Sequence, residues 1–307
     1  MDERHRRELV EIGGQWIRFH CPMSQYTTFR VGGRVEAIYF TQALSHLKRM
    51  VSYLSEESIP YLVVGRGSNL LVKDGGLKGV VIILQGELAT IEQNGRNDRI
   101  ILAGGGVSIG EVLSYCKLKG LSGLEFLAGI PGTVGGAVAM NAGAFGKDTG
   151  SMVQDIEMVT RQGDLVMKDR SQLHFSYRIA SVPWGAVLVK ARFELNKDDP
   201  DSIAGRIADH LTRRRAKQPL EYPSGGSIFK NPPNDYAGRL IENAGLKGKR
   251  IGKALISPKH ANFIVNTGGA RAEDILALMD LARERVREET GIELEPEIKV
   301  VGQGDDK

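Results

Sequence analysis

The feature that most restricts what this chain can fold into is a glycine-rich segment from Ala128 to Gly146. It reads AGIPGTVGGAVAMNAGAFG, with six glycines and with small residues at many of the positions between them. An ordinary loop does not need side chains removed at so many neighbouring positions. A main chain stripped in this way can lie flat against a large planar ligand and its pyrophosphate. The segment therefore predicts a bound cofactor.

A second glycine-containing segment, GRGSNLL at residues 65–71, follows directly on the apolar run at 61–64, which we predict to be a buried strand. Glycines and small polar residues at the end of a strand form a turn whose N–H groups can converge on an anion. The segment is not the dinucleotide fingerprint, because position 70 is Leu, and it lacks the GK[ST] of a Walker loop. On its own it could equally be a tight structural turn.

Apolar spacing predicts the main helices and strands. Residues 43–54 have helical spacing, and Ser108 with Glu111 forms a capping box that opens a helix ending at Gly120. The polar stretch 196–201 should break regular structure and mark a domain boundary. We also predict a short N-terminal helix and tether, helices near 203–211, 236–244 and 275–286, and strands near 80–84, 100–103, 156–160, 164–168, 186–195 and 293–301.

The size and charge of the chain favour an enzyme for anionic ligands. Its 307 residues suggest two or three domains. The net charge is only +4, from 41 basic and 37 acidic side chains. A nucleic-acid binder should show basic clusters with aromatic residues between them, so no nucleic-acid partner is expected. The densest basic run, Arg213–Lys217, ends a helical pattern and could either complement the helix dipole or bind a ligand.

The cysteines and the N-terminus exclude other classes. Cys21 and Cys116 lack metal-ligand spacing and have apolar neighbours, so we expect two reduced, structural thiols and no metal. The N-terminus has no apolar core of a signal peptide. The longest aliphatic run, 80–84, is too short to span a membrane. A cytoplasmic protein without membrane insertion is the expectation.

Together, the two glycine-rich segments resemble the FAD-binding domain of the p-cresol methylhydroxylase type. The segment TTFRVGG at 27–33 also resembles the opening of this domain in its reductase branch. The resemblance implies that the pyrophosphate of a non-covalently bound FAD lies between two small α+β subdomains. It implies FAD contacts from Gly65, Arg66, Gly67, Ser68, Asn69, Leu70, Gly129, Ile130, Pro131, Gly132, Thr133, Gly135, Gly136 and Ala137.

Three further segments resemble motifs of the UDP-N-acetylenolpyruvoylglucosamine reductases. They are FSYR at 175–178, GGSIFKNP at 225–232 and LEPEIKVVG at 294–302. Lys217–Pro219 and Lys259–Phe263 match the same family less distinctively. The matches run from about residue 27 to 302 in the family's order, which covers almost the whole chain.

The resemblance implies an α+β fold with a two-subdomain FAD-binding part and a C-terminal α+β substrate-binding domain. The implied division is an N-terminal helix or tether (1–24), FAD-binding subdomain 1 (25–85, joined by a C-terminal strand at 292–302), FAD-binding subdomain 2 (86–196) and a substrate-binding domain (202–291). We expect a monomer.

The activity implied by the resemblance is NADPH-dependent reduction of UDP-N-acetylglucosamine enolpyruvate to UDP-N-acetylmuramate in peptidoglycan precursor synthesis. Hydride would pass from flavin N5 to C3, leaving an enolate at C2 and its carboxylate. Arg178, a permanent planar cation, is suited to stabilise that enolate. Ser227 would protonate C2, with Glu297 as the neighbour that relays or stabilises charge. Substrate contacts are implied for Tyr177, Lys217, Lys230 and Asn231.

Some alternatives stay open at this point. Spacing alone does not separate Glu295 from Glu297, since residues two apart on a strand share a face. Flavin oxidases share the FAD-binding fold, and many attach FAD through a His or Cys, but residues 61–72 and 128–146 contain neither. A flavin-binding protein without catalysis would not need Arg178, Ser227 and Glu297 together. Only 38 residues separate Arg178 from Lys217, so the chain resembles the shorter class of the family, without an inserted tyrosine-bearing loop.

Overall fold

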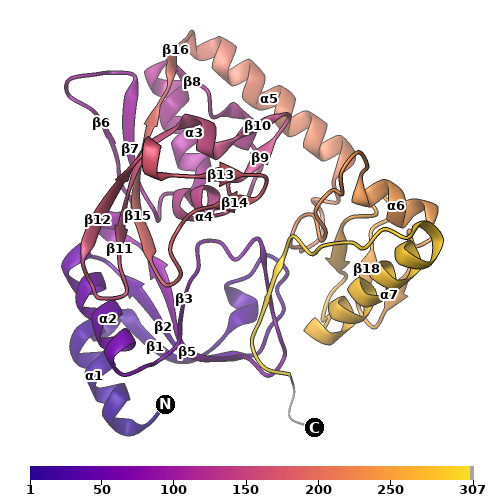
Figure 1. Cartoon of the computed structure of the whole chain (residues 1–307), viewed down its shortest axis with the longest axis horizontal. Coiled ribbons are helices and arrows are strands. Elements are labelled where there is room, and N and C mark those ends of the chain that lie inside the picture. Colours follow the sequence, from indigo (N-terminus) through magenta and orange to yellow (C-terminus); the bar gives the residue numbers. More distant parts are fainter. Residues whose placement is uncertain (305–307) are drawn as a thin grey trace. The chain divides into compact units, whose positions relative to one another are not determined.

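A computed structural model describes residues 1–304 (Figure 1). The chain mixes helices and strands in an α+β fold, as predicted. By contact density it divides into two compact units. Unit 1 comprises residues 1–19, 36–65 and 79–212, and unit 2 comprises 20–35, 66–78 and the chain from Arg213 onward. Each unit is described by itself.

The N-terminal helices of unit 1 pack on a four-stranded sheet. Residues of both helices form one buried cluster with residues of the sheet, among them Leu9, Leu47 and Ile82. Helix α2 places its predicted apolar stripe in this core. The strand order is β1-β2-β5-β3, and β3 runs parallel to β5. The elements are α1 (Glu3–Gly13), α2 (Leu44–Glu56), β1 (Ile17–Pro22), β2 (Arg34–Thr41), β5 (Leu77–Leu84) and β3 (Tyr61–Val63).

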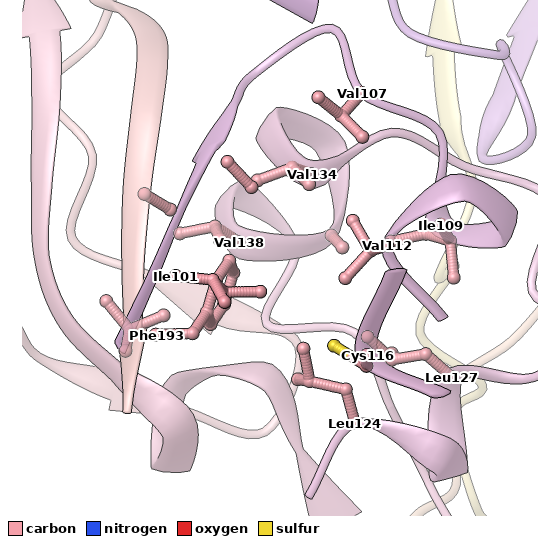
Figure 2. Close-up of a cluster of buried hydrophobic side chains, with 14 of the residues drawn as sticks. Ile101, Val107, Ile109, Val112, Cys116, Leu124, Leu127, Val134, Val138 and Phe193 are labelled. Carbon is pink, nitrogen blue, oxygen red and sulfur yellow. The ribbon is translucent and has the colours of Figure 1, made fainter. Parts of the chain in front are cut away.

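A five-stranded antiparallel sheet forms the other part of unit 1, with the order β12-β11-β15-β7-β6. Helices α3 and α4 enclose a core with its strands β7 and β15, and Figure 2 shows side chains from all four elements in this core. The elements are β12 (Leu165–Asp169), β11 (Val153–Val159), β15 (Val187–Glu194), β7 (Ile100–Gly104), β6 (Ile91–Gln93), α3 (Ile109–Lys119) and α4 (Val134–Ala139). Short pairs complete the unit: β8 (Leu121–Ser122) with β16 (Asn196–Lys197), β9 (Gly143–Ala144) with β10 (Lys147–Asp148), and β13 (Phe175–Ser176) with β14 (Ile179–Ala180).

Helix α3 confirms the capping prediction. The Ser108 hydroxyl accepts from the Glu111 N–H at 3.2 Å, the Glu111 carboxylate accepts from the Ser108 N–H at 2.9 Å, and Gly120 is left-handed with φ 61°. Cys116 lies on the buried face of α3 beside Leu124 and Leu127 (Figure 2). Burial raises the pKa of its thiol to about 12. This cysteine is therefore a structural thiol, as predicted.

Unit 2 is built around α7 (Ala272–Thr290). The apolar stripe predicted for this helix is buried along its length, in one core with residues of α6 and β18. Beyond this core, β20 pairs in parallel with β4, which joins residues more than 220 positions apart in the chain. The other elements are α6 (Ala237–Asn243), β17 (Arg250–Ile251), β18 (Ala254–Ile256), β19 (Ile264–Asn266), β4 (Leu70–Val72) and β20 (Lys299–Val301). Helix α5 (Pro200–Lys217) contributes to both units and ends, as predicted, with the basic run.

Several local predictions were wrong. The strand expected over 293–301 exists only at 299–301, because Pro296 has no N–H to donate and residues 295–297 pair instead with 228–230. No regular element was predicted inside the glycine-rich segment, where α4 forms. The boundary stretch 196–201 holds β16 and the start of α5, with Pro200 at its first position, where a missing N–H costs nothing. Among residues 1–304, no helix is long and apolar enough to cross a membrane.

A distant carboxylate caps α7. The two carboxylate oxygens of Asp74 accept from the N–H groups of Ala272 at 2.9 Å and Glu273 at 3.0 Å. An anion at a helix N-terminus is favoured by the helix dipole. We expect Asp74→Ala to lower the free energy of unfolding by about 1–2 kcal/mol, because two N–H groups lose their acceptor. Urea denaturation would measure this, with Asp74→Asn, which keeps one acceptor, losing less. An unchanged midpoint in Asp74→Ala would contradict the capping role.

Candidate active site

Gly65, the first glycine of the 65–71 segment, packs closely on Thr133 of the glycine-rich segment 128–146. A Cβ atom added to Gly65 would lie 2.4 Å from the hydroxyl oxygen of Thr133, which a real side chain does not tolerate. Both residues belong to unit 1. The structure therefore brings the two predicted flavin-binding segments into contact at this point, and glycine is the residue that permits the approach.

The rest of the first segment is held within unit 2 by residues from both ends of the chain. Gly67 is left-handed, with φ 60°, and its carbonyl accepts from the Thr28 N–H at 3.4 Å. The Asn69 side chain donates to the carbonyl of Glu297 at 3.0 Å, and the carbonyl of Asn69 accepts from the Lys299 N–H at 3.0 Å. Two segments that resembled reductase motifs in sequence, 27–33 and 294–302, therefore hold this turn in shape.

The second segment folds into α4, whose first turn is satisfied inside the chain. The Thr133 hydroxyl accepts from the Gly136 N–H at 3.4 Å, Val134 donates to the carbonyl of Val107 at 2.9 Å, and Gly135 donates to the carbonyl of Gly105 at 2.9 Å. These N–H groups serve the fold and are not offered to phosphate oxygens. At the start of α4 these three N–H groups are therefore engaged within the chain.

Two glycines of this segment have no steric reason inside the chain to be glycine. A Cβ atom on Gly132 would have its nearest neighbour at 3.8 Å, and one on Gly136 at 3.6 Å, which are ordinary contact distances. Neither residue has a positive φ. Their missing side chains leave the main chain open to close approach by a group from outside the chain. This opening fits the flat cofactor that the sequence predicts.

Arg178 lies in the two-residue turn of the hairpin β13–β14, which belongs to unit 1. It is left-handed, with φ 61°, although it is not glycine. Such a conformation costs free energy, and residues that keep it are concentrated at functional sites. Its guanidinium lies over the ring of Tyr177, 5.1 Å from the ring centre, and Tyr177 is 52% exposed. The turn presents a cation beside an exposed aromatic ring.

Ser227 lies in unit 2, in a turn whose backbone is fixed on both sides. Gly225 packs directly on the ring of Phe29, since an added Cβ atom would lie 2.2 Å from a ring carbon, and Gly226 is left-handed with φ 77°. The next residues are held by Asn262. Its side chain accepts from the Phe229 N–H at 3.0 Å and donates to the Phe229 carbonyl at 2.8 Å. The serine therefore lies on a rigid support.

The structure separates the two candidate glutamates. Glu297 is half-buried, and its N–H donates to the carbonyl of Ile228, the residue after Ser227, at 2.8 Å. Glu295 is exposed and forms an ion pair with Lys230. The main chain of Glu297 is thus held beside the serine turn, and the carboxylate of Glu295 is paired with Lys230. The motif position indicates Glu297, and its role stays a prediction.

The predicted substrate-binding residues have different surroundings. Lys217 ends helix α5, and Lys230 pairs with Glu295. The side-chain oxygen of Asn231 accepts from the Ala237 N–H at 3.1 Å, at the start of α6, so this residue has a structural role. Ser227, Glu297, Lys230 and Asn69 are brought together in unit 2. The sequence indicated Asn262 only as part of the segment 259–263 and not its role, because one asparagine carries no signal until its backbone partners are known.

His260 accepts the Asn262 N–H on Nδ1 at 3.2 Å and lies edge-on against the ring of Phe263. Burial is the main cause that lowers the pKa of this ring below 6.5, and the charge of Lys247 adds to it. Between the lowered pKa of the folded chain and 6.5, the unfolded chain binds more protons at His260 than the folded chain does. The free energy of unfolding is therefore unaffected by this histidine above pH 6.5 and falls as the pH is lowered through that window.

We expect the urea midpoint to fall with pH in that window, and the His260→Gln variant, which does not titrate there, to lose this part of the pH dependence. A slope that persists unchanged in the variant would show that other groups cause it.

Comparison with known proteins identifies the cofactor and the family. Residues 35–167 match the model of an FAD-binding domain, and residues 218–301 match that of the C-terminal domain of UDP-N-acetylenolpyruvoylglucosamine reductase. The reductase named for that substrate in Alkalilimnicola ehrlichii is 45% identical over 94% of this chain and 95% of its own length. The UDP-N-acetylenolpyruvoylglucosamine reductase of Geobacter metallireducens is 42% identical over 98% of this chain and 99% of its own length. The crystal structure of the Thermus caldophilus enzyme superposes with a TM-score of 0.80 at 38% identity, covering 92% of this chain and 99% of that one.

The fold and the site thus define an oxidoreductase that binds FAD. Its cofactor is FAD, with NADPH as the reductant, as predicted. Within that class, the chain belongs to the family of UDP-N-acetylenolpyruvoylglucosamine reductases, which act in peptidoglycan precursor synthesis. The family expected from the motifs is confirmed.

Proposed function

We propose that this chain reduces the enolpyruvyl ether of UDP-N-acetylglucosamine enolpyruvate to the lactyl ether of UDP-N-acetylmuramate. Family membership supports the overall reaction. The observation that supports the assignment of residues is the bond from the Glu297 N–H to the carbonyl of Ile228, which places the main chain of Glu297 beside the Ser227 turn. FAD, held by residues 65–70 and 129–137, would supply a hydride for C3 of the enolpyruvyl group, with NADPH as the reductant. The residues of the chain handle the charge and the proton that this addition requires.

Arg178 is proposed to stabilise the enolate. Hydride addition at C3 places negative charge on C2 and on the attached carboxylate. A guanidinium stays charged at any pH of interest and can donate two parallel N–H bonds to a carboxylate. The left-handed backbone of Arg178 supports this role, because the fold maintains a costly conformation at this position. A donor held in place before the reaction stabilises developing charge more than a mobile one.

Ser227 is proposed to deliver the proton to C2. A serine hydroxyl is a weak acid, so it needs a neighbour that relays a proton or stabilises the alkoxide. Glu297, bonded through its backbone to the residue after Ser227, is the neighbour that the structure offers. In its protonated form, the Glu297 carboxyl could replace the proton that Ser227 gives up. The bonds of Asn262 to Phe229 fix the main chain that follows Ser227, which supports a positioned hydroxyl for proton transfer.

The remaining predicted residues are proposed to bind the substrate and the cofactor. Lys217 and Lys230, with Tyr177, supply charge and an exposed ring suited to a sugar nucleotide. Asn231 can contact the substrate only through its side-chain nitrogen, since its oxygen holds α6. Residues 65–70 and 129–137 are proposed to hold FAD without a covalent bond, in subdomains 25–85 and 86–196, and residues 202–291 to bind the substrate. We propose a cytoplasmic monomer of the shorter class.

An anaerobic absorbance titration tests the whole proposal. The purified yellow protein should lose its long-wavelength flavin band on addition of NADPH and regain it on addition of UDP-N-acetylglucosamine enolpyruvate, in stoichiometric amounts. Failure of the sugar nucleotide to restore the band would overturn the proposed substrate. Denaturing precipitation should leave a colourless pellet, and a yellow pellet would show covalent attachment instead.

A further inference from the structure

We infer that Asn141 is a positioning residue, which connects the end of the glycine-rich segment to the hairpin that carries Arg178. This inference rests on the proposed function, because it concerns how the arginine of that reaction is held. All of the residues involved belong to unit 1.

The side chain of Asn141 donates one hydrogen bond and accepts another, and so connects two other segments. Its Nδ2 donates to the carbonyl of Ser176 at 2.9 Å, and its Oδ1 accepts from the Gly150 N–H at 2.8 Å. Ser176 is the last residue of β13, two positions before Arg178. Only an amide offers one donor and one acceptor in this arrangement. A carboxylate could satisfy Gly150 but would place an oxygen against the carbonyl of Ser176.

The surroundings show that this connection is part of the fold and not a surface contact. Asn141 is 1% exposed and left-handed, with φ 40°. It follows directly on α4, and its own N–H donates to the carbonyl of Val138 at 3.0 Å. The same hairpin is held a second time, since the ring of Phe175 packs on Gly150, where an added Cβ atom would lie 2.3 Å from a ring carbon. Asparagine also tolerates the left-handed region better than most residues.

This arrangement has a consequence for the reaction. Helix α4 carries Gly136, which is left open to the cofactor, and Asn141 ties the end of that helix to the hairpin of Arg178. The guanidinium is therefore positioned from the same short segment that is proposed to hold FAD. Loss of the amide would leave the hairpin held by the packing of Phe175 on Gly150 alone, so that the arginine is positioned less precisely while the cofactor-binding glycines stay in place.

Tryptic cleavage after Arg178 tests the connection without any activity measurement. We expect the Arg178–Ile179 bond, followed by mass spectrometry, to be cut about tenfold faster in Asn141→Asp than in the wild-type holoenzyme, because a hairpin that loses a buried hydrogen bond opens more often. The matched control is Thr149→Val. It removes a part-buried hydrogen bond, from the Thr149 hydroxyl to the carbonyl of Ala142 at 2.7 Å, between residues that neighbour Gly150 and Asn141 but lie outside the hairpin. Its cleavage at Arg178 should stay at the wild-type rate.

Half-reaction kinetics then test the positioning role. Asn141→Asp should slow reoxidation of the reduced flavin by the enolpyruvyl substrate about tenfold, with flavin reduction by NADPH little changed. In an Arg178→Ala background it should have almost no further effect, since both changes act through one group. If Asn141→Asp does not fold, Asn141→Gly keeps the left-handed backbone without the two side-chain bonds and serves the same tests.

Three results would overturn the inference: cleavage at Arg178 that is no faster than in Thr149→Val, equal losses in both half-reactions, or losses that add fully to those of Arg178→Ala. If Arg178→Ala alone leaves the substrate half-reaction unchanged, the proposed role of Arg178 fails. The cleavage experiment still decides in that case whether Asn141 holds the hairpin.

Discussion

Replacement of Ser227 by alanine should slow reduction of the enolpyruvyl substrate by about 10²–10⁴-fold, the usual contribution of a positioned proton donor. Reduction of the flavin by NADPH should stay close to the wild-type rate, because that step does not need a proton at C2 of the substrate. Anaerobic stopped-flow measurement of the two half-reactions separates these effects. The turn itself should persist in the variant, since it is held by the Asn262 side chain and the Glu297 backbone and not by the serine hydroxyl.

Ser224→Ala is the matched control for this experiment. Ser224 lies three residues earlier in the same stretch and pairs with Val265 through its backbone, which the substitution leaves intact. Both half-reactions should remain at wild-type rates in the control. If Ser227→Ala slowed the two half-reactions equally, Ser227 would not be the proton donor, and a general disturbance of the flavin site would be the better explanation.

Replacement of Arg178 by alanine should lower the rate of substrate reduction by about 10²–10³-fold, the cost of losing one fixed donor aimed at developing charge. Arg178→Lys should recover only part of this loss, because an ammonium does not reproduce the bidentate geometry of a guanidinium. Most of this decrease should appear in the single-turnover rate of substrate reduction measured at saturating substrate. A loss confined to KM would mean that Arg178 binds the ground state and the transition state equally well.

Arg161→Ala controls for the loss of positive charge in unit 1. Arg161 stacks on Trp184 at 4.2 Å from the ring centre, and nothing places it in the proposed site. Its removal should leave the half-reactions unchanged. If it slowed substrate reduction as much as Arg178→Ala does, long-range attraction of the anionic substrate would account for both results, and the specific contact of Arg178 would be contradicted.

The regular parts of the fold were predictable where local chemistry alone decides them. Helix α3 has a capping box at its start and a left-handed glycine at its end, and both signals are contained within a few residues. The apolar residues of α7 likewise recur at helical spacing, which predicts the buried face of this helix. By contrast, β4 and β20 have three residues each and exist only because they pair with each other across the chain. Therefore β4 was not predicted, and β20 was predicted only as the end of a longer strand over 293–301.

The candidate site shows the same division. Motif residues such as Ser227 and Glu297 were named from the sequence, but the ion pair of Glu295 with Lys230 was not predicted. Asn141 and Asn262 were not predicted as supports, since each acts by bonding to main-chain groups from other segments. Side-chain contacts with a distant backbone leave no pattern in the sequence. Only the folded chain reveals which amides hold the site.

The pairing of β20 with β4 sets an order of events during synthesis. The turn at 65–70 is made early, but its neighbouring strand acquires a partner only when residues 299–301 have left the ribosome. Contacts between such remote positions also form slowly, because a long stretch of chain must be brought together. A nascent chain that stops before β20 should therefore lack the partner of the strand that follows the proposed FAD-binding turn at 65–70.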